Sequence, residues 1–192
     1  MFSENESGNL RQSFIDKIVL SGKDVKSIGT KSFYYIRTLL SVDMSDAQEI
    51  ASIGESAFAD CAQLTTVTFG DASKITTIGA KAFSGCSALA SLNQNSDGNN
   101  DLSTSSLAKI ESKAFENCTS LANIYFPSTL MRISSDAFSG ALAATNDKVF
   151  IKADATGFEK LHRSVWICPV TLFVLGRYPK YIYIKQICNC PF

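Results

Sequence analysis

Apolar residues recur along this chain in a frame that repeats about every 25 residues. A phenylalanine marks each copy of the frame, at Phe33, Phe58, Phe83, Phe115 and Phe138. The differences between these residue numbers are 25, 25, 32 and 23, so one copy carries an insertion. Independent amphipathic helices would follow the helical period alone and would not share a phenylalanine frame. The pattern therefore indicates structural repeats stacked on one another.

Further apolar columns accompany the phenylalanines. Two columns precede each phenylalanine, and they contain Val25, Ile50, Ile75, Leu107 and Leu130, then Ile28, Ile53, Ile78, Ile110 and Ile133. Two columns follow it, and they contain Leu39, Leu64, Leu89 and Leu121, then Val42, Val67, Leu92 and Ile124. Stretches such as LTTVTF alternate like a half-buried strand, whereas the AFxxC stretches space apolar residues like one helical or 3₁₀ turn.

One copy cannot bury its apolar face, but stacking copies at the ~5 Å spacing of hydrogen-bonded strands closes a continuous core. We therefore predict a repeat solenoid with short strands in a curved parallel sheet on one face and short helical or 3₁₀ turns and loops on the other. The frame I-x-x-I-G-x-x-A-F-x-x-C-x-x-L-x-x-V resembles the BspA-type leucine-rich repeat over roughly residues 14–150. The departures are Glu111 and Ser134 at the glycine position and Ala141 at the cysteine position.

The repeat frame divides the chain into segments. Residues 1–13 are an N-terminal extension, and residues 14–150 form a leucine-rich-repeat-like solenoid of about five to six turns. Residues 93–106 are a polar insertion that we expect to be a mobile loop. Residues 151–166 are similar to the cap that follows such repeats in the resembled family. For residues 167–192, cap strands, a poorly folded end and sequence foreign to the repeat all remain open.

Charge and hydropathy narrow the classes of partner. Lys plus Arg equals Asp plus Glu at 18 each, so no field of one sign attracts nucleic acid or anionic lipid. The longest apolar run, Val165–Leu175, is shorter than the ~20 residues of a spanning helix, and we predict no membrane span. The sequence as written shows no signal peptide. The family resemblance nevertheless implies a cell-surface or secreted protein.

No residue pattern predicts catalysis, a metal or a cofactor. Cys61, Cys86 and Cys118 share one repeat column, which predicts buried, reduced thiols. Cys168, Cys188 and Cys190 lack paired C-x-x-C spacing for zinc, and His162 has no nucleophile signature beside it. In the insertion, Asn93, Asn95 and Asp97 stand at alternate positions, as the ligands of a calcium loop do. The acidic residue that begins such a loop and the glutamate that closes it are missing. An unstructured loop is therefore favoured over calcium binding.

Strand alternation defines a candidate binding face. Val67 and Phe69 point into the core, so their neighbours Thr66 and Thr68 point outward. The equivalent outward pairs are Ser41 and Asp43, Ser91 and Asn93, and Asn123 and Tyr125.

We expect a non-catalytic module for adhesion or protein interaction that binds a protein or glycan through this face. The predicted contacts are Thr66, Thr68, Ser91, Asn93, Asn123 and Tyr125, and Tyr125 is the strongest candidate. The alternative is that these side chains only solvate the sheet, in a structural spacer or degenerate repeat copy without its own partner.

Overall fold

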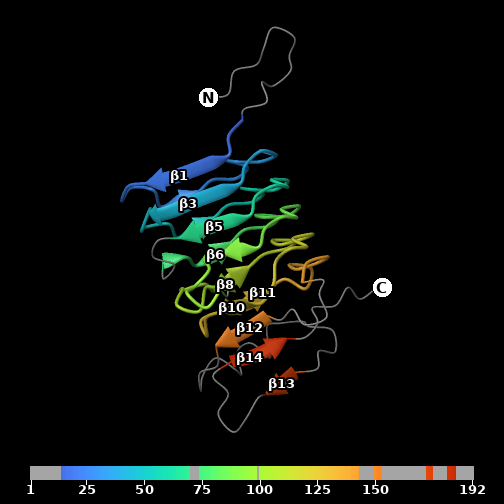
Figure 1. The fold of residues 1–192 in the computed structure, drawn as a ribbon. Coiled ribbons are helices and arrows are strands. Elements are labelled where there is room, and N and C mark those ends of the chain that lie inside the picture. Colours follow the sequence, from blue (N-terminus) through green and yellow to red (C-terminus); the bar gives the residue numbers. More distant parts are fainter. Residues whose placement is uncertain are drawn as a thin grey trace.

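The computed structural model describes residues 14–69, 74–98, 100–142, 149–152, 172–174 and 181–184. It is a β-solenoid of about five turns, with β1 at one end and β13 at the other (Figure 1), and the predicted fold class is confirmed. Each turn contributes strands to two columns, which we call the broad sheets and the narrow sheet. Three sets of predictions lie outside the described residues: those for residues 1–13, those for most of the proposed cap with His162, and those for the tail cysteines Cys168, Cys188 and Cys190.

The broad column consists of two sheets that follow one another along the solenoid. The first is entirely parallel, in the order β1-β3-β5-β7, and its strands are Lys17–Ser21, Ser41–Asp46, Thr66–Phe69 and Ser91–Leu92. The second has the order β13-β14-β12-β10-β8, with strands Leu172–Val174, Tyr181–Ile184, Val149–Lys152, Ile124–Phe126 and Asn100–Asp101. Strands β8, β10 and β12 are parallel, whereas β14 is antiparallel to both β12 and β13. The two stretches of residues 167–192 that the structure describes, β13 and β14, are thus strands of the second broad sheet.

The narrow sheet is continuous through all the repeats. Its strands, two residues each, are β2 (Ser27–Ile28), β4 (Ser52–Ile53), β6 (Thr77–Ile78), β9 (Lys109–Ile110) and β11 (Arg132–Ile133). Their second residue is the predicted isoleucine column, and it is buried in every strand. The sequence showed this column as apolar, but two residues are too few for strand alternation to be recognised.

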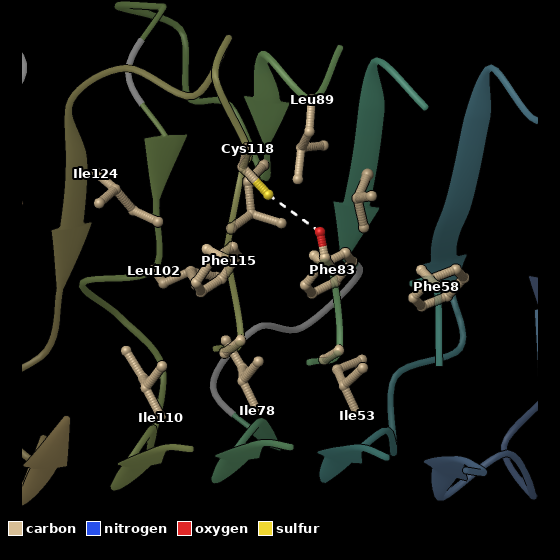
Figure 2. Packing of buried hydrophobic residues seen from close by; sticks show 14 of the residues in the cluster. Ile53, Phe58, Ile78, Phe83, Leu89, Leu102, Ile110, Phe115, Cys118 and Ile124 are labelled. Atoms are coloured by element: carbon tan, nitrogen blue, oxygen red, sulfur yellow. Dashed lines mark hydrogen bonds between the residues drawn. The ribbon is translucent and has the colours of Figure 1, made fainter. Parts of the chain in front are cut away.

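The phenylalanine column forms a stack of rings inside the solenoid (Figure 2). Ring centroids from Phe33 to Phe138 are separated by 5.2, 5.3, 5.5 and 5.0 Å, and neighbouring rings are within 15° of parallel. Phe58, Phe83 and Phe115 are fully buried between a ring on each side. This offset stacking adds to the free energy that burial of the apolar surface contributes.

Each phenylalanine lies in a turn segment that bonds to its neighbouring copies. Within one segment, i→i+3 hydrogen bonds join Ala57 to Gly54 and Ala59 to Ser56, as the 3₁₀-like spacing predicted. Between them, the N–H of Phe58 donates to the carbonyl of Ala82 in the following turn, at 2.8 Å. Positive φ at Ser56 and at Asp60 stops the segment from continuing as a helix.

Glycine allows the turns to approach each other closely beside the narrow sheet. A Cβ at Gly54 would lie 2.7 Å from the carbonyl oxygen of Ile28, and one at Gly79 would lie 2.8 Å from that of Ile53. These contacts are with backbone of the preceding turn, which cannot move without changing the spacing of the stack. Gly29, in the first turn, meets only the Ser32 hydroxyl.

The described part of the insertion, residues 93–98 and 100–106, contains a strand and defined hydrogen bonds, contrary to the expectation of a mobile loop. Its second half forms β8, which pairs with β10 of the next copy, and it places Leu102 in the core. The side chain of Asn100 is buried, where it accepts from the N–H of Leu92 at 2.7 Å and donates to the carbonyl of Ala122 at 3.0 Å. A polar composition concealed this strand, because Asn100 stands where the other strands have an aliphatic residue.

Candidate functional site

The outward side of the broad sheets, which we call the strand face, has side chains in register from strand to strand. Ser41, Thr66 and Ser91 are paired in one row, and Asp43 pairs with Thr68 in the next. All five are partly exposed, whereas the residues between them in each strand are buried. The predicted outward orientation of Thr66, Thr68 and Ser91 is therefore what the structure shows.

The second row continues into the second broad sheet with a change of chemistry. Asp101 pairs with Tyr125, which pairs with Phe150. The rings of Tyr125 and Phe150 stack with centroids 4.3 Å apart and planes 6° from parallel. Both side chains are partly exposed. The strand face therefore has hydroxyl groups over β3, β5 and β7 and an aromatic pair over β10 and β12.

The side chain of Asn93, a predicted contact residue, is hydrogen-bonded to neighbouring strands and does not follow the alternation on which the prediction was based. Its side chain accepts from the N–H of Phe69 at 3.1 Å and donates to the carbonyl of Asp101 at 3.0 Å. The chain leaves the strand at this point with a positive φ at Asn93, so strand alternation no longer sets the side-chain direction. Asn123 lies immediately before β10 and is partly buried.

Sequence reasoning missed Phe150 and Asp101 as residues of this face. The alternation of VFIK at 149–152, with buried Val149 and Ile151, was a usable signal for Phe150. Asp101 had no such signal, because its strand is two residues long and lies within a polar stretch.

The carboxylate at the N-terminal part of the strand face is held in its charged form. The hydroxyl and N–H of Ser45 both donate to Asp43, at 2.7 and 3.1 Å, and they hold the pKa of Asp43 below its ordinary value. Lys17 on β1 lies 3.9 Å from the same carboxylate. This part of the face therefore offers hydrogen-bonding groups and the ion pair of Lys17 and Asp43.

The oxygens of the suggested calcium loop bind backbone and side-chain donors. Asn95 Oδ1 accepts from the N–H of Asp97, and Asp101 accepts from the N–H of Ser103 and from Asn95 Nδ2. These bonds fix the conformation of the loop that leads into β8. In the part of the chain that the structure describes, no three His, Cys, Asp or Glu side chains gather as they would around a metal ion.

The three repeat cysteines form a ladder of buried thiols, as predicted. Cys61, Cys86 and Cys118 are unbridged, and each Sγ donates to a phenylalanine carbonyl of the preceding turn at 3.1 Å. Figure 2 shows this bond between Cys118 and Phe83. Burial raises the pKa of Cys61 to about 11 and that of Cys118 to about 12, and it also raises the pKa of Cys86. The thiols are therefore protonated at neutral pH.

Three of the solved structures that match this fold are leucine-rich-repeat proteins. A leucine rich cell surface protein from Faecalibacterium prausnitzii matches with a TM-score of 0.60 and 25% identity, over 83% of this chain and 40% of that one. A leucine-rich repeat protein from Eubacterium ventriosum matches with a TM-score of 0.55 and 26% identity, over 67% of this chain and 31% of that one. The chain thus spans less than half the length of either protein.

A third structure, the leucine rich repeat protein of T. pallidum, shares the fold with a TM-score of 0.56 and 23% identity, over 80% of this chain and 68% of that one. No curated protein matches the chain in sequence. The family described as BspA type leucine rich repeat region matches residues 8–140 and 94–156, with six copies. Together with the stacked isoleucine, phenylalanine and cysteine columns, this match shows that the chain belongs to the BspA-type leucine-rich-repeat family.

Proposed function

We propose that this protein is a non-catalytic binding module of the cell surface that binds a protein ligand through its strand face. The observation that carries the proposal is the stacked pair Tyr125 and Phe150, two partly exposed aromatic rings on the outward side of the sheet. Aromatic residues are favoured in strands, and a pair across two strands also stabilises the sheet. Aromatic residues are in addition enriched where proteins bind one another, and this supports a binding role for the exposed part of the two rings.

The neighbouring side chains suit an interface around such an anchor. Asp101 lies beside Tyr125 in the same row, and the hydroxyls of Thr66, Thr68 and Ser91 extend the face along the solenoid. Tyrosine provides contact area with little side-chain entropy to lose, and its hydroxyl remains able to bond at a wet interface. Hydroxyl groups around the anchor would provide the polar rim that protein interfaces have.

The state of the cysteines supports a role without catalysis. A catalytic cysteine needs a lowered pKa and access to substrate. The thiols of Cys61, Cys86 and Cys118 have raised pKa values and donate to backbone carbonyls inside the stack. They stabilise the solenoid and are unsuited to attack a substrate.

The surface location rests on relatives. The Faecalibacterium prausnitzii protein is described as a cell surface protein, and it shares the fold over 83% of this chain. Within the described ranges, no helix has the length and apolar character needed to cross a membrane.

A binding screen against host cell-surface and matrix proteins tests the proposal. For a ligand found in the screen, Tyr125→Ala should weaken binding by roughly thirtyfold, the effect of losing a hot-spot contact of about 2 kcal/mol. A combined Thr66→Glu, Ser91→Glu variant should also weaken binding, through added charge on the same face. Lys109→Ala, an exposed change on the narrow sheet, is the control. Circular dichroism would establish that each variant is folded.

The competing function is a structural spacer with no ligand of its own, and it is favoured by the ordinary preference of threonine for strands. A screen without any ligand would support the spacer. Binding that is unaffected by both strand-face variants would move the site to another surface.

A further inference from the structure

The first turn segment differs from the later ones in a way that the fold does not require. Tyr34 occupies the column that holds Ala59, Ser84, Glu116 and Ser139 in the later turns. Tyr35 occupies the column that holds Asp60, Gly85, Asn117 and Gly140. Tyr34 and Tyr35 are 47% and 48% exposed, so neither ring serves as core. Two adjacent aromatic side chains thus lie on the surface of the turn side, away from the strand face.

Tyr35 is also held in an unfavourable backbone conformation. Its φ is +63°, in the left-handed region. The equivalent residues Asp60, Gly85, Asn117 and Gly140 share this conformation, but they are the types that adopt it readily. A bulky residue at positive φ is rare, and strain of this kind gathers where a side chain has a functional task. An asparagine or glycine would suit the fold of this turn better than the tyrosine.

Charged groups surround the two rings. The guanidinium carbon of Arg37 lies 4.4 Å from the centroid of Tyr35, and Nζ of Lys31 lies 6.0 Å from that of Tyr34. The carboxylate of Asp60 lies beside Tyr34 and raises the pKa of that phenol. Within the described residues, Arg37 has no hydrogen bond or ion pair, so its planar set of N–H donors is available to a carboxylate from outside the chain.

We propose that Tyr34, Tyr35 and Arg37, together with Asp60, form a binding site for an acidic glycan. The two ring centroids are 5.8 Å apart and the rings are tilted by 31°, and the cations of Arg37 and Lys31 lie over one face of each ring, so a sugar would stack on the opposite faces. A sugar stacks its C–H face on such rings. Arg37 binds the carboxylate of a uronic or sialic acid, and Asp60 accepts hydrogen bonds from sugar hydroxyls. This site is independent of the strand face.

A glycan fits these groups better than an acidic peptide does. A peptide carboxylate would use Arg37 and Lys31 but would leave the two exposed rings without a matching group, and it would be repelled by the Asp60 carboxylate that is hydrogen-bonded to Tyr34. An acidic sugar presents an apolar face, hydroxyl donors and a carboxylate on one small unit. That combination matches the aromatic, anionic and cationic groups of the site.

The test measures binding of three acidic probes, tetragalacturonate, a hyaluronan tetrasaccharide and sialyllactose, by calorimetry. A combined Tyr34→Ala, Tyr35→Asn variant gives the first turn the residues that later turns have at Ala59 and Asn117. We expect its denaturation midpoint to be unchanged or higher, because the strain at Tyr35 is removed, while the affinity for the bound probe falls by roughly tenfold or more. Arg37→Gln should reduce that affinity to the level of neutral galactotetraose.

Two controls separate this site from other surfaces. Met131→Ala removes an exposed apolar side chain of a later turn, and Tyr125→Ala alters the strand face. Both variants should leave glycan affinity unchanged. A failure of the glycan-site proposal can therefore be distinguished from a failure of the strand-face proposal. Any of four results would overturn the inference: no binding of the three acidic probes, equal binding of galactotetraose, equal binding of hexaglutamate, or full affinity in the double tyrosine variant.

Discussion

The broad and narrow columns of strands respond differently to the same insertion. In the narrow sheet, β6 and β9 pair directly, Thr77 with Lys109 and Ile78 with Ile110, as though no residues had been added. In the broad column, the regular ladder stops at β7, and a second sheet starts with β8. The rings of Phe83 and Phe115 remain 5.5 Å apart across this point. The spacing of the stack is therefore held by the narrow sheet and the phenylalanine column, while the broad side accommodates the extra chain.

A side chain joins the two broad sheets where backbone pairing is irregular. The amide of Asn100 bonds to the N–H of Leu92 on one side and to the carbonyl of Ala122 on the other. It thereby supplies the acceptor and the donor that a peptide group supplies within a regular ladder. The broad column is thus continuous in hydrogen bonding at this place, through the side chain of Asn100 and through the bonds between Asn93 and Asp101.

The largest expected effect comes from removing the extra strand. Deleting Asn100–Ser106 restores the regular repeat length but removes β8 and the buried side chain of Leu102. Losing a buried leucine alone costs about 2–5 kcal/mol, a large part of the ~5–15 kcal/mol that stabilises a domain. We expect the second broad sheet to unfold in denaturant titrations. Deleting only the exposed Ser96 and Asp97 should have little effect. A stable long deletion would show that β8 is dispensable.

The next largest effect is expected in the phenylalanine column, which crosses the insertion. Phe83→Ala removes a fully buried ring that stacks on both Phe58 and Phe115. The free energy of unfolding should fall by about 3–5 kcal/mol, against changes within about 0.5 kcal/mol for Thr66→Ala on the strand face. Similar denaturation midpoints for the two variants would contradict a structural role for the stack.

Substitutions at two glycines test how tightly the turns are spaced beside the narrow sheet. Gly54→Ala would bring a Cβ against the backbone of the preceding turn, whereas Gly29→Ala would meet only a serine hydroxyl. We expect the first change to cost about 1–3 kcal/mol, the usual range for overpacking, and the second to cost clearly less. Thermal unfolding of the matched pair measures this difference. Equal melting temperatures would mean that the turns separate easily on this side.

Replacing Asn100, which joins the two broad sheets, should reduce the free energy of unfolding by a smaller amount. Asn100→Ala leaves the N–H of Leu92 and the carbonyl of Ala122 without their side-chain partner. An unsatisfied buried polar group costs about 1–3 kcal/mol, and water entering the created space would reduce the loss. Gln94→Ala, an exposed change in the same loop, is the control for chemical denaturation. If Asn100→Ala matched this control, backbone pairing alone would join the sheets.

Removing one thiol of the ladder should change the free energy of unfolding least of all at neutral pH, and the change should depend on pH in alkaline solution. The pKa of Cys118 is about 12 in the folded protein, against ~8.5 in an unfolded chain. Because the folded pKa is the higher one, the thiol contributes fully to the free energy of unfolding below about pH 8.5. This contribution falls as the pH rises toward 12, by up to about 1.4 kcal/mol per pH unit. The free energies of unfolding of the wild type and Cys118→Ala should therefore converge between pH 8 and pH 10. A constant difference would indicate an accessible thiol.

The repeat frame allowed the fold to be predicted because each column has one physical task. Two columns could be recognised as buried without knowledge of the contacts: the phenylalanines Phe58, Phe83 and Phe115, and the small apolar thiols of Cys61, Cys86 and Cys118. The outward direction of Thr66 and Ser91 followed from alternation within a strand. These features are local and recur, which is what a single sequence reveals.

The features that were missed depend on contacts between turns or on single residues. Nothing local distinguishes Asn100 from the asparagines around it, since its two partners come from Leu92 and Ala122. The positive φ of Tyr35 is likewise invisible in the sequence, because its column contains four different residue types. The aromatic pair of Tyr125 and Phe150 required the parallel register of β10 and β12, which no sequence spacing fixes.

The unequal behaviour of the two columns has a consequence for how such proteins change in evolution. A duplicated copy that gains residues after its broad strand, as the copy after β7 did, keeps its narrow strand, its phenylalanine and its thiol in line with the copies on either side. Residues gained between Gly79 and Phe83 would instead move both the phenylalanine and the thiol out of line with the narrow strand. Natural variation in repeat length should therefore accumulate at the corner that follows the broad strands, leaving each lineage free to alter the surface there while the interior is inherited unchanged.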